Sequence, residues 1–120
     1  MEPIFDGNGR VCGWLMSEVV YDLDVQVRAF LSGEAVFSYD CIYLGSFHNG
    51  FFRDQYGDAV AFIRGAQGGP VTPLTELPAF PSLPPLPPLH GLPPLPPLPP
   101  RPSLNWSGLE WEEFLYGSRM

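Results

Sequence analysis

The sequence predicts an all-β fold: a small pseudo-four-fold symmetric barrel of four β-hairpins, followed by a disordered proline-rich linker and a short C-terminal helix. Two observations carry this prediction, a repeat in the first half of the chain and a sharp change of composition after it. The repeat has a period of 16 residues and reads Ile4-Phe5-Asp6, Val20-Tyr21-Asp22, Val36-Phe37-Ser38 and Phe52-Arg53-Asp54. A fixed period of this kind indicates a repeated structural unit.

Each repeat is predicted to be a β-hairpin, because two β-rich runs flank a cluster of turn-forming residues. The aspartate that opens such a turn can bond the backbone two residues on. Gly9 and Gly57 can then adopt a positive φ without steric cost, whereas Val25 and Cys41 stand at the same place in the second and third repeats. The aspartate before each of these two residues tolerates left-handed backbone, so the second and third turns are expected to differ in type from the others.

The second strands of the repeats are predicted to converge near an axis, because one face carries only glycine or alanine at its middle. These small residues are Gly13, Ala29, Gly45 and Ala61. Four hairpins laid flat would leave exposed edges, which closure around a pseudo-four-fold axis removes. We therefore assign residues 1–67 to a small barrel of eight short strands.

On the opposite face of these strands, three of the four equivalent positions carry an aromatic residue: Trp14, Phe30 and Phe62. Ser46 occupies the fourth position and interrupts this circle of aromatic residues. The three aromatic residues are our candidates for lining the mouth of an axial apolar pocket or for docking the C-terminal helix. Ordinary contacts in the core or beneath a lid are the alternative.

Residues 68–104 form a proline-rich tract that holds all of the 16 prolines except Pro3. Proline removes backbone donors and fixes φ, so the tract is predicted to be a polyproline II linker that acts as a semi-rigid spacer. The run Pro96-x-x-Pro99-x-Arg101 has the general form of an SH3-type ligand, although such matches are inevitable in this composition. Leucine at every third position would line one side of the extended helix and could bind an aromatic groove.

Residues 105–120 are predicted to contain a short amphipathic helix, from about residue 108 to 116. Ser107 and Glu110 have the spacing of a capping box, Trp106 and Trp111 fit a hydrophobic staple, and Gly117 suits the stop. The candidate interaction residues of this segment are Trp106, Leu109, Trp111, Phe114 and Leu115. Such a short helix is marginal alone, so it either covers the barrel mouth or binds another protein.

The repeats that begin at Ile4-Phe5-Asp6 and Gly13-Trp14-Leu15, with their three echoes and the tail around Trp106 and Trp111, resemble the bacterial four-fold beta-flower proteins. The resemblance covers residues 1–67 and, more loosely, 105–116. It implies a shallow barrel of four hairpins, similar in shape to the tubby C-terminal-like domains, some of which bind lipids. It implies no activity and no catalytic residues.

The composition disfavours several classes of partner. The net charge is −7 and there is no lysine, so the chain lacks the basic footprint of a nucleic-acid-binding protein and has no charge attraction to anionic membranes. We see no signal peptide and no apolar run long enough to span a membrane, and we expect a cytoplasmic protein. Cys12 and Cys41 occupy different places in the repeat and are expected to be free thiols.

No catalytic, metal-binding or cofactor-binding constellation is evident. Asp6, Asp22 and Asp54 occupy equivalent turn positions, where opening the turn is the simpler role. We therefore expect a non-catalytic structural or protein-interaction module, with a partner bound through the C-terminal helix or the proline tract. The alternative is a barrel that binds a small apolar ligand or lipid.

Overall fold

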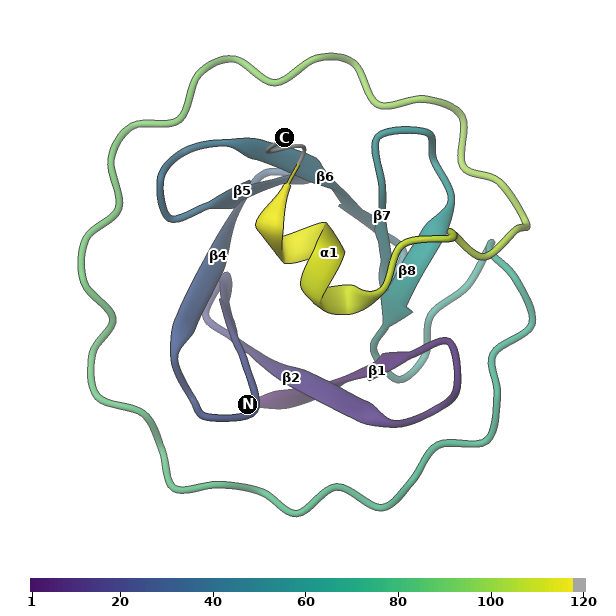
Figure 1. Cartoon of the computed structure of the whole chain (residues 1–120), viewed down its shortest axis with the longest axis horizontal. Coiled ribbons are helices and arrows are strands. Elements are labelled where there is room, and N and C mark those ends of the chain that lie inside the picture. Colours follow the sequence, from purple (N-terminus) through teal and green to yellow (C-terminus); the bar gives the residue numbers. More distant parts are fainter. Residues whose placement is uncertain (118–120) are drawn as a thin grey trace.

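Eight strands of the computed structural model, which describes residues 1–117, close into one antiparallel barrel (Figure 1). Each strand pairs with the next along the chain, and the first pairs with the last to complete the ring. The strands are β1 (Glu2–Asp6), β2 (Val11–Met16), β3 (Val19–Tyr21), β4 (Val27–Ser32), β5 (Ala35–Ser38), β6 (Tyr43–His48), β7 (Phe51–Arg53) and β8 (Ala59–Phe62). The predicted all-β class and barrel are confirmed.

The hairpins β1–β2, β3–β4, β5–β6 and β7–β8 share one irregularity in their strand pairing. The register shifts between the first two residues of each repeat, at Ile4/Phe5, Val20/Tyr21, Val36/Phe37 and Phe52/Arg53. A β-bulge of this kind re-aims side chains locally. The first residue of each pair accordingly packs in the axial core, whereas Phe5, Tyr21 and Phe37 pack in separate clusters around it.

All four turns have the same hydrogen-bond pattern, so the expectation that the second and third differ is wrong. The amide of the fourth turn residue donates to the carbonyl of the first in the pairs Gly9–Asp6, Val25–Asp22, Cys41–Ser38 and Gly57–Asp54. Val25 and Cys41 themselves adopt left-handed φ angles of 60° and 63°. One carboxylate oxygen of Asp22 accepts the amides of Asp24 and Gln26. These bonds and the strand pairing outweigh the roughly 1–2 kcal/mol that a left-handed residue other than glycine costs.

The axis of the barrel is filled by side chains from all four repeats. Ile4, Val20, Val36 and Phe52 are completely buried there. The small residues of the second strands lie at crowded points, as expected. A Cβ on Gly45 would lie 2.0 Å from the carbonyl oxygen of Arg53 and 3.0 Å from the Phe114 ring. The glycine therefore leaves room both for the paired strand and for the C-terminal helix.

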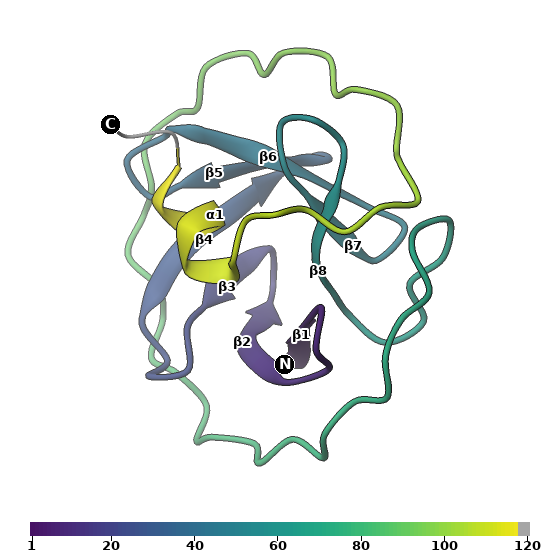
Figure 2. The same ribbon diagram turned by 45° about the vertical axis from the view of Figure 1, so that its right-hand side comes forward.

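The helix α1 (Trp111–Tyr116) lies across one mouth of the barrel, as Figures 1 and 2 show. It begins later than predicted, because its N-cap residue is Glu110, whose amide donates to the carboxylate of Glu113 at 2.9 Å. Ser107, the predicted cap, instead donates its hydroxyl to the carboxylate of Asp54. The Ser107 side chain, predicted to cap the helix, thus makes a tertiary hydrogen bond with the β7–β8 turn instead.

The helix ends as predicted at Gly117, which has a φ of 77° and donates its amide to the carbonyl of Phe114. The predicted staple is not formed, since Trp106 and Trp111 belong to different apolar clusters. Residues 118–120 of the predicted C-terminal segment lie outside the described residues.

Residues 68–104, which we call the strap, run around the outside of the barrel as an extended ring (Figures 1 and 2). The described strap has neither helix nor strand, in keeping with its proline content. It touches the barrel at several points: the amide of Glu76 donates to the carbonyl of Gly9, and the amide of Ser103 donates to the carbonyl of Gly57. The structure therefore does not confirm a disordered linker that holds barrel and helix apart.

Candidate functional site

One row of strap residues faces the barrel. Half-buried prolines recur at multiples of three residues, at Pro78, Pro81, Pro84, Pro87 and Pro93. Polyproline II has three residues per turn, so this spacing puts them on one side of the extended chain. The strap therefore has an inner side that touches the barrel and an outer side that does not.

The predicted site residues Trp14, Phe30 and Phe62 lie under the strap and the segment that follows it, not at the axis. Each belongs to a peripheral cluster, separate from the axial core, because the residue before it on its strand points inward. Each is covered by an aromatic ring from beyond the barrel. The pairs are Trp14–Phe80, Phe30–His90 and Phe62–Trp106, with ring centroids 5.3, 3.5 and 6.0 Å apart.

The closest of these contacts is the stack of His90 on Phe30, whose ring planes differ by 3°. The ring of Tyr39 stands at 90° to His90 and at 87° to Phe30. The imidazole therefore contacts the face of one aromatic ring and is flanked by a second, perpendicular one. The Tyr39 hydroxyl donates to the carbonyl of Pro88 at 3.1 Å. His90 and the Tyr39 hydroxyl therefore anchor the middle of the strap to the barrel.

Both ends of the strap are held by Arg53, which is 2% exposed. Its guanidinium donates to the carbonyls of Gly68 at 3.2 Å, Ser103 at 2.9 Å and Gly57 at 2.7 Å. Burial lowers the pKa of Arg53, an effect that Asp58 and Asp54 oppose. The sequence reasoning missed this residue, although a signal existed: Arg53 breaks the aromatic series Phe5, Tyr21 and Phe37.

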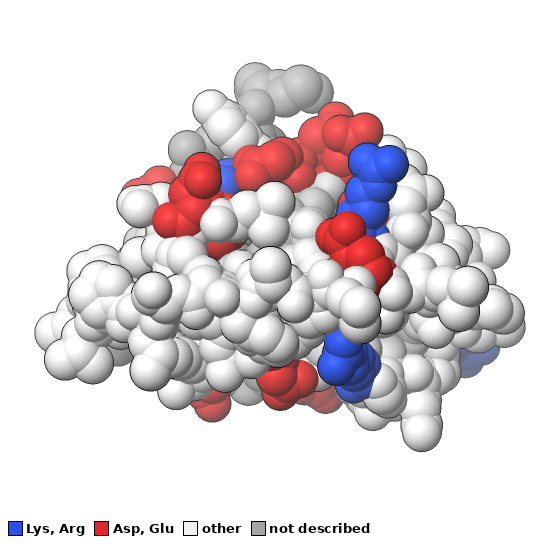
Figure 3. Space-filling view, turned by 90° about the horizontal axis from the view of Figure 1, so that it is seen from below, with Lys and Arg blue, Asp and Glu red and all other residues white. Residues whose placement is uncertain are grey.

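The outer side of the strap is an apolar row, which we call the ridge. Its residues are Leu74, Leu77, Leu83, Leu86, Leu89, Leu92, Leu95 and Leu98. Phe80 falls in the same register but packs on Trp14 instead, so it is not part of the ridge. Leu86, Leu89 and Leu92 are 95%, 99% and 96% exposed. Figure 3 views the molecule edge-on and shows a broad uncharged surface across its middle, with acidic side chains along the upper edge. The ridge adds an apolar surface to an otherwise acidic protein.

The C-terminal interaction residues divide into buried and exposed ones. Trp111, Phe114 and Leu115 are buried in the axial core, and Trp106 is half-buried against Phe51 and Phe62. Leu109, by contrast, precedes the helix and is exposed. The apolar face of α1 is therefore already occupied by the barrel.

Arg28 fastens the helix to β4. Its two terminal nitrogens donate to the two carboxylate oxygens of Glu112, at 2.9 and 2.8 Å, and one of them also donates to Asp22 at 3.3 Å. This bidentate geometry is a strong and directional form of ion pair. The Glu112 bond and charge raise the pKa of Arg28.

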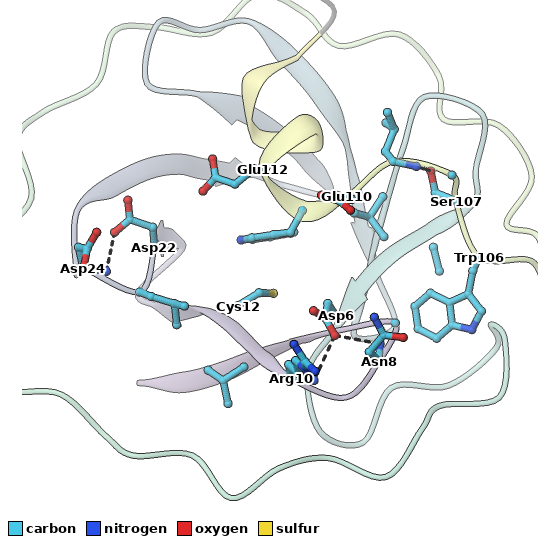
Figure 4. Close-up of a pocket in the computed structure, with 18 residues that line it drawn as sticks. Asp6, Asn8, Arg10, Cys12, Asp22, Asp24, Trp106, Ser107, Glu110 and Glu112 are labelled. Atoms are coloured by element: carbon cyan, nitrogen blue, oxygen red, sulfur yellow. Dashed lines mark hydrogen bonds between the residues drawn. The ribbon is translucent and has the colours of Figure 1, made fainter.

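A groove of about 860 Å³ lies between the helix and the first two hairpin turns (Figure 4). Its charged lining is mostly acidic, with Asp6, Asp22, Asp24, Glu110 and Glu112 around Arg10. Several of these carboxylates already have structural partners. One oxygen of Asp6 accepts the amides of Asn8 and Arg10, as the dashed lines in Figure 4 mark.

Cys12 lies inside this groove, and Figure 4 shows its sulfur between the acidic groups. Burial, and then the charge of Asp6, raise the pKa of the Cys12 thiol. The thiol donates to the carbonyl of Ile4 at 3.4 Å. A thiol that stays protonated is a poor nucleophile, so the groove does not activate it.

A second groove of about 720 Å³ follows the other flank of the helix, beside the β7–β8 turn. Its apolar lining comes from Leu44, Leu109, Phe114 and the rings of Tyr56 and Tyr116. This is the surface of the barrel mouth that best suits an apolar molecule.

Within residues 1–117, no group of three or more His, Cys, Asp or Glu side chains could hold a metal ion. No helix in that same range is long and apolar enough to cross a membrane.

Comparison with known proteins identifies a family. A family model described as a 4-fold beta flower protein matches residues 2–115. No curated protein and no solved structure matches the chain.

Proposed function

The chain belongs to the 4-fold beta flower proteins, a family whose description names a fold and no activity. From the surface of the molecule, we propose that the protein is a non-catalytic protein-interaction module. The barrel is the scaffold, and the ridge on the strap is the surface that meets a partner protein. The observation that carries this proposal is the nearly complete exposure of Leu86, Leu89 and Leu92.

An exposed apolar row of this length favours a binding role. Large exposed apolar patches on soluble proteins mark interaction sites. Polyproline II is a preformed ligand, and aromatic-lined grooves of other domains recognise it. Because Arg53 and His90 hold the strap in its extended form, binding would order few additional residues, which favours affinity.

The helix is the weaker candidate for contacting a partner. Trp111, Phe114 and Leu115 would have to leave the axial core before they could contact another protein. Undocking would expose these three side chains to water. The lost burial free energy would be roughly 1.5–3 kcal/mol for Phe114 and about the same for Leu115. The strap needs no such rearrangement.

A non-catalytic role is supported by the state of the reactive groups. The thiol of Cys12 is held protonated, and carboxylates of the mouth groove serve turns and the Arg28 pair. The two cysteines are unpaired, as a reducing compartment such as the cytoplasm would leave them.

Binding of a small apolar ligand is the second candidate, and the groove beside Tyr56 and Tyr116 is the observation that favours it. The axial interior is less suitable, because barrel and helix side chains pack against one another there. Native mass spectrometry of the freshly purified full-length chain tests this candidate. A retained apolar molecule would favour it over the interaction module.

The interaction module is tested by measuring binding of the full-length chain to purified SH3, WW and EVH1 domains, which read polyproline II. The ridge variant is Leu86→Ser, Leu89→Ser and Leu92→Ser together. Its matched control is Leu23→Ser with Tyr56→Ser, two exposed apolar residues outside the strap.

We expect at least one domain to bind the native chain and the control equally, and the ridge variant about tenfold or more weakly. Absence of binding by all three classes would overturn the proposed partner class. Equal weakening by both variants would move the site away from the ridge.

A further inference from the structure

The contact between the strap and the barrel has the features of a peptide-recognition site. Aromatic rings of the barrel face two side chains of an extended proline-rich chain, and a tyrosine hydroxyl binds one of its carbonyls. We call Trp14, Phe30 and Tyr39 the outer aromatic surface. Trp14 and Phe30 are 3% and 1% exposed, although they lie outside the axial core.

The contacts are concentrated at two strap residues. Phe80 packs on Trp14 with a centroid distance of 5.3 Å, and His90 lies flat on Phe30. The row of half-buried prolines runs between them. The barrel therefore contacts the strap at two aromatic side chains a fixed number of residues apart, so both the identity of these side chains and their spacing matter for the fit.

The attachment is suited to exchange, because prolines have no amide hydrogen with which to join a ladder. The middle of the strap is held by ring contacts and the Tyr39–Pro88 hydrogen bond. The stronger anchors are outside this stretch, at Glu76 and at Arg53. Release of residues 80–93 from the barrel would therefore leave both anchors of the strap in place.

We propose that the outer aromatic surface is a binding site for proline-rich peptides in the polyproline II form, and that residues 80–93 are its resident ligand. A peptide of the same chemistry added in trans competes with the resident segment for Trp14, Phe30 and Tyr39. This site uses Phe80, His90 and the inner prolines, none of which belongs to the ridge, so it is independent of the partner proposed for the ridge.

The resident segment is a strong competitor, because tethering gives it an effective concentration in the millimolar range. The experiment therefore needs a full-length chain with a weakened resident ligand and an unchanged barrel. Phe80→Ala with His90→Ala provides it, since both side chains lie on the exposed strap and only their rings contact the barrel.

The test titrates an isotope-labelled full-length chain with a synthetic peptide of residues 80–93 and follows the amide signals of Phe30 and Tyr39 and the indole signal of Trp14. We expect the peptide to bind the Phe80→Ala/His90→Ala chain about tenfold or more tightly than the native chain. A peptide carrying the same two alanines is expected to bind weakly to both.

A second variant separates recognition from general stickiness. Tyr39→Phe in the weakened chain removes only the hydroxyl that binds Pro88, so we expect peptide affinity to fall about twofold to tenfold. Tyr56→Phe, at an exposed ring of the β7–β8 turn, is expected to leave it unchanged.

The proposal is overturned if millimolar peptide leaves the weakened chain unshifted, or if the shifts lie at the barrel mouth. Equal affinity for the native and weakened chains would overturn it as well. None of these results would alter binding at the ridge, so this proposal and the proposed function can fail separately.

Discussion

Arg28 on β4 holds both carboxylate oxygens of Glu112 on α1, at 2.9 and 2.8 Å. This pair joins a barrel strand to a helix that follows it by more than eighty positions in the chain. The Glu112 side chain is 63% exposed, so solvent screens the pair.

We predict that Glu112→Gln lowers the free energy of unfolding by at most about 1 kcal/mol, as for other solvent-screened pairs. Urea denaturation at low and high salt measures this, and the difference from the native chain is expected to shrink in high salt. Glu2→Gln, which removes an exposed carboxylate on the barrel, is the control. A loss of several kcal/mol would show that the pair is more shielded from water than its exposure indicates.

Helix docking is predicted to depend on Trp111 and hardly at all on Leu109. Trp111→Ala removes a ring that packs on Phe52 and Phe114, at an expected cost of about 3–5 kcal/mol. Leu109→Ala alters a side chain that is 41% exposed, at an expected cost below about 1 kcal/mol. Thermal unfolding measures the stability of both variants. Similar losses of stability in the two would contradict the docking of the helix through Trp111.

We predict that the strap can pack on the first turn only because Gly9, at the end of that turn, has no side chain. A Cβ on Gly9 would lie 2.0 Å from the carbonyl oxygen of Leu74, whereas a Cβ on Gly33 would meet nothing within 4 Å. Both residues have positive φ, so Gly9→Ala and Gly33→Ala share a similar backbone penalty of about 1–2 kcal/mol. We expect only Gly9→Ala to increase protease cleavage within the strap. Equal cleavage of the two variants would show that the strap does not depend on this close approach.

Alkaline pH is predicted to destabilise the fold through Tyr21. Burial raises the pKa of this phenol above its ordinary value of 10.0. A raised folded-state pKa means that the contribution to stability is complete below pH 10 and is lost as the pH rises through the folded-state pKa. The Tyr21 hydroxyl is also buried with no hydrogen-bond partner among the described residues.

Tyr21→Phe should therefore leave stability unchanged or raise it by about 1 kcal/mol at neutral pH, since it removes a buried unpaired hydroxyl. It should also make the fall in melting temperature above pH 10 shallower. Melting temperatures between pH 7 and 11 measure both effects, with Tyr56→Phe as the exposed control. A steeper alkaline fall in the Tyr21→Phe chain would contradict the assignment.

Local patterns predicted the hairpins because each hairpin satisfies its own backbone. Asp22, for example, bonds amides two and four residues later, so the turn is encoded within five residues. The type of the second and third turns was nevertheless mispredicted. Val25 accepts a left-handed backbone because strand pairing on both sides fixes the turn, and no single-residue preference reveals that constraint.

The sequence pattern grouped three aromatic residues of the barrel but did not predict what packs on them. Trp14, Phe30 and Phe62 were recognised as an equivalent set, and they do form contacts with segments from beyond the barrel. Strand alternation puts these rings on the side away from the axis. Only the path of the strap and of the segment after it decides which rings cover them.

The sequence by itself determined the all-β class and the four hairpins, because these follow from a repeat whose turns are stabilised locally. It also determined that the described strap forms neither helix nor strand, since proline removes backbone donors and restricts φ regardless of surroundings. Only the tertiary structure decided where the strap and the helix lie. His90 meets Phe30, and Arg53 meets Gly68 and Ser103, through contacts between residues far apart in the chain, whose energies depend on the closed barrel and are not encoded in any local pattern.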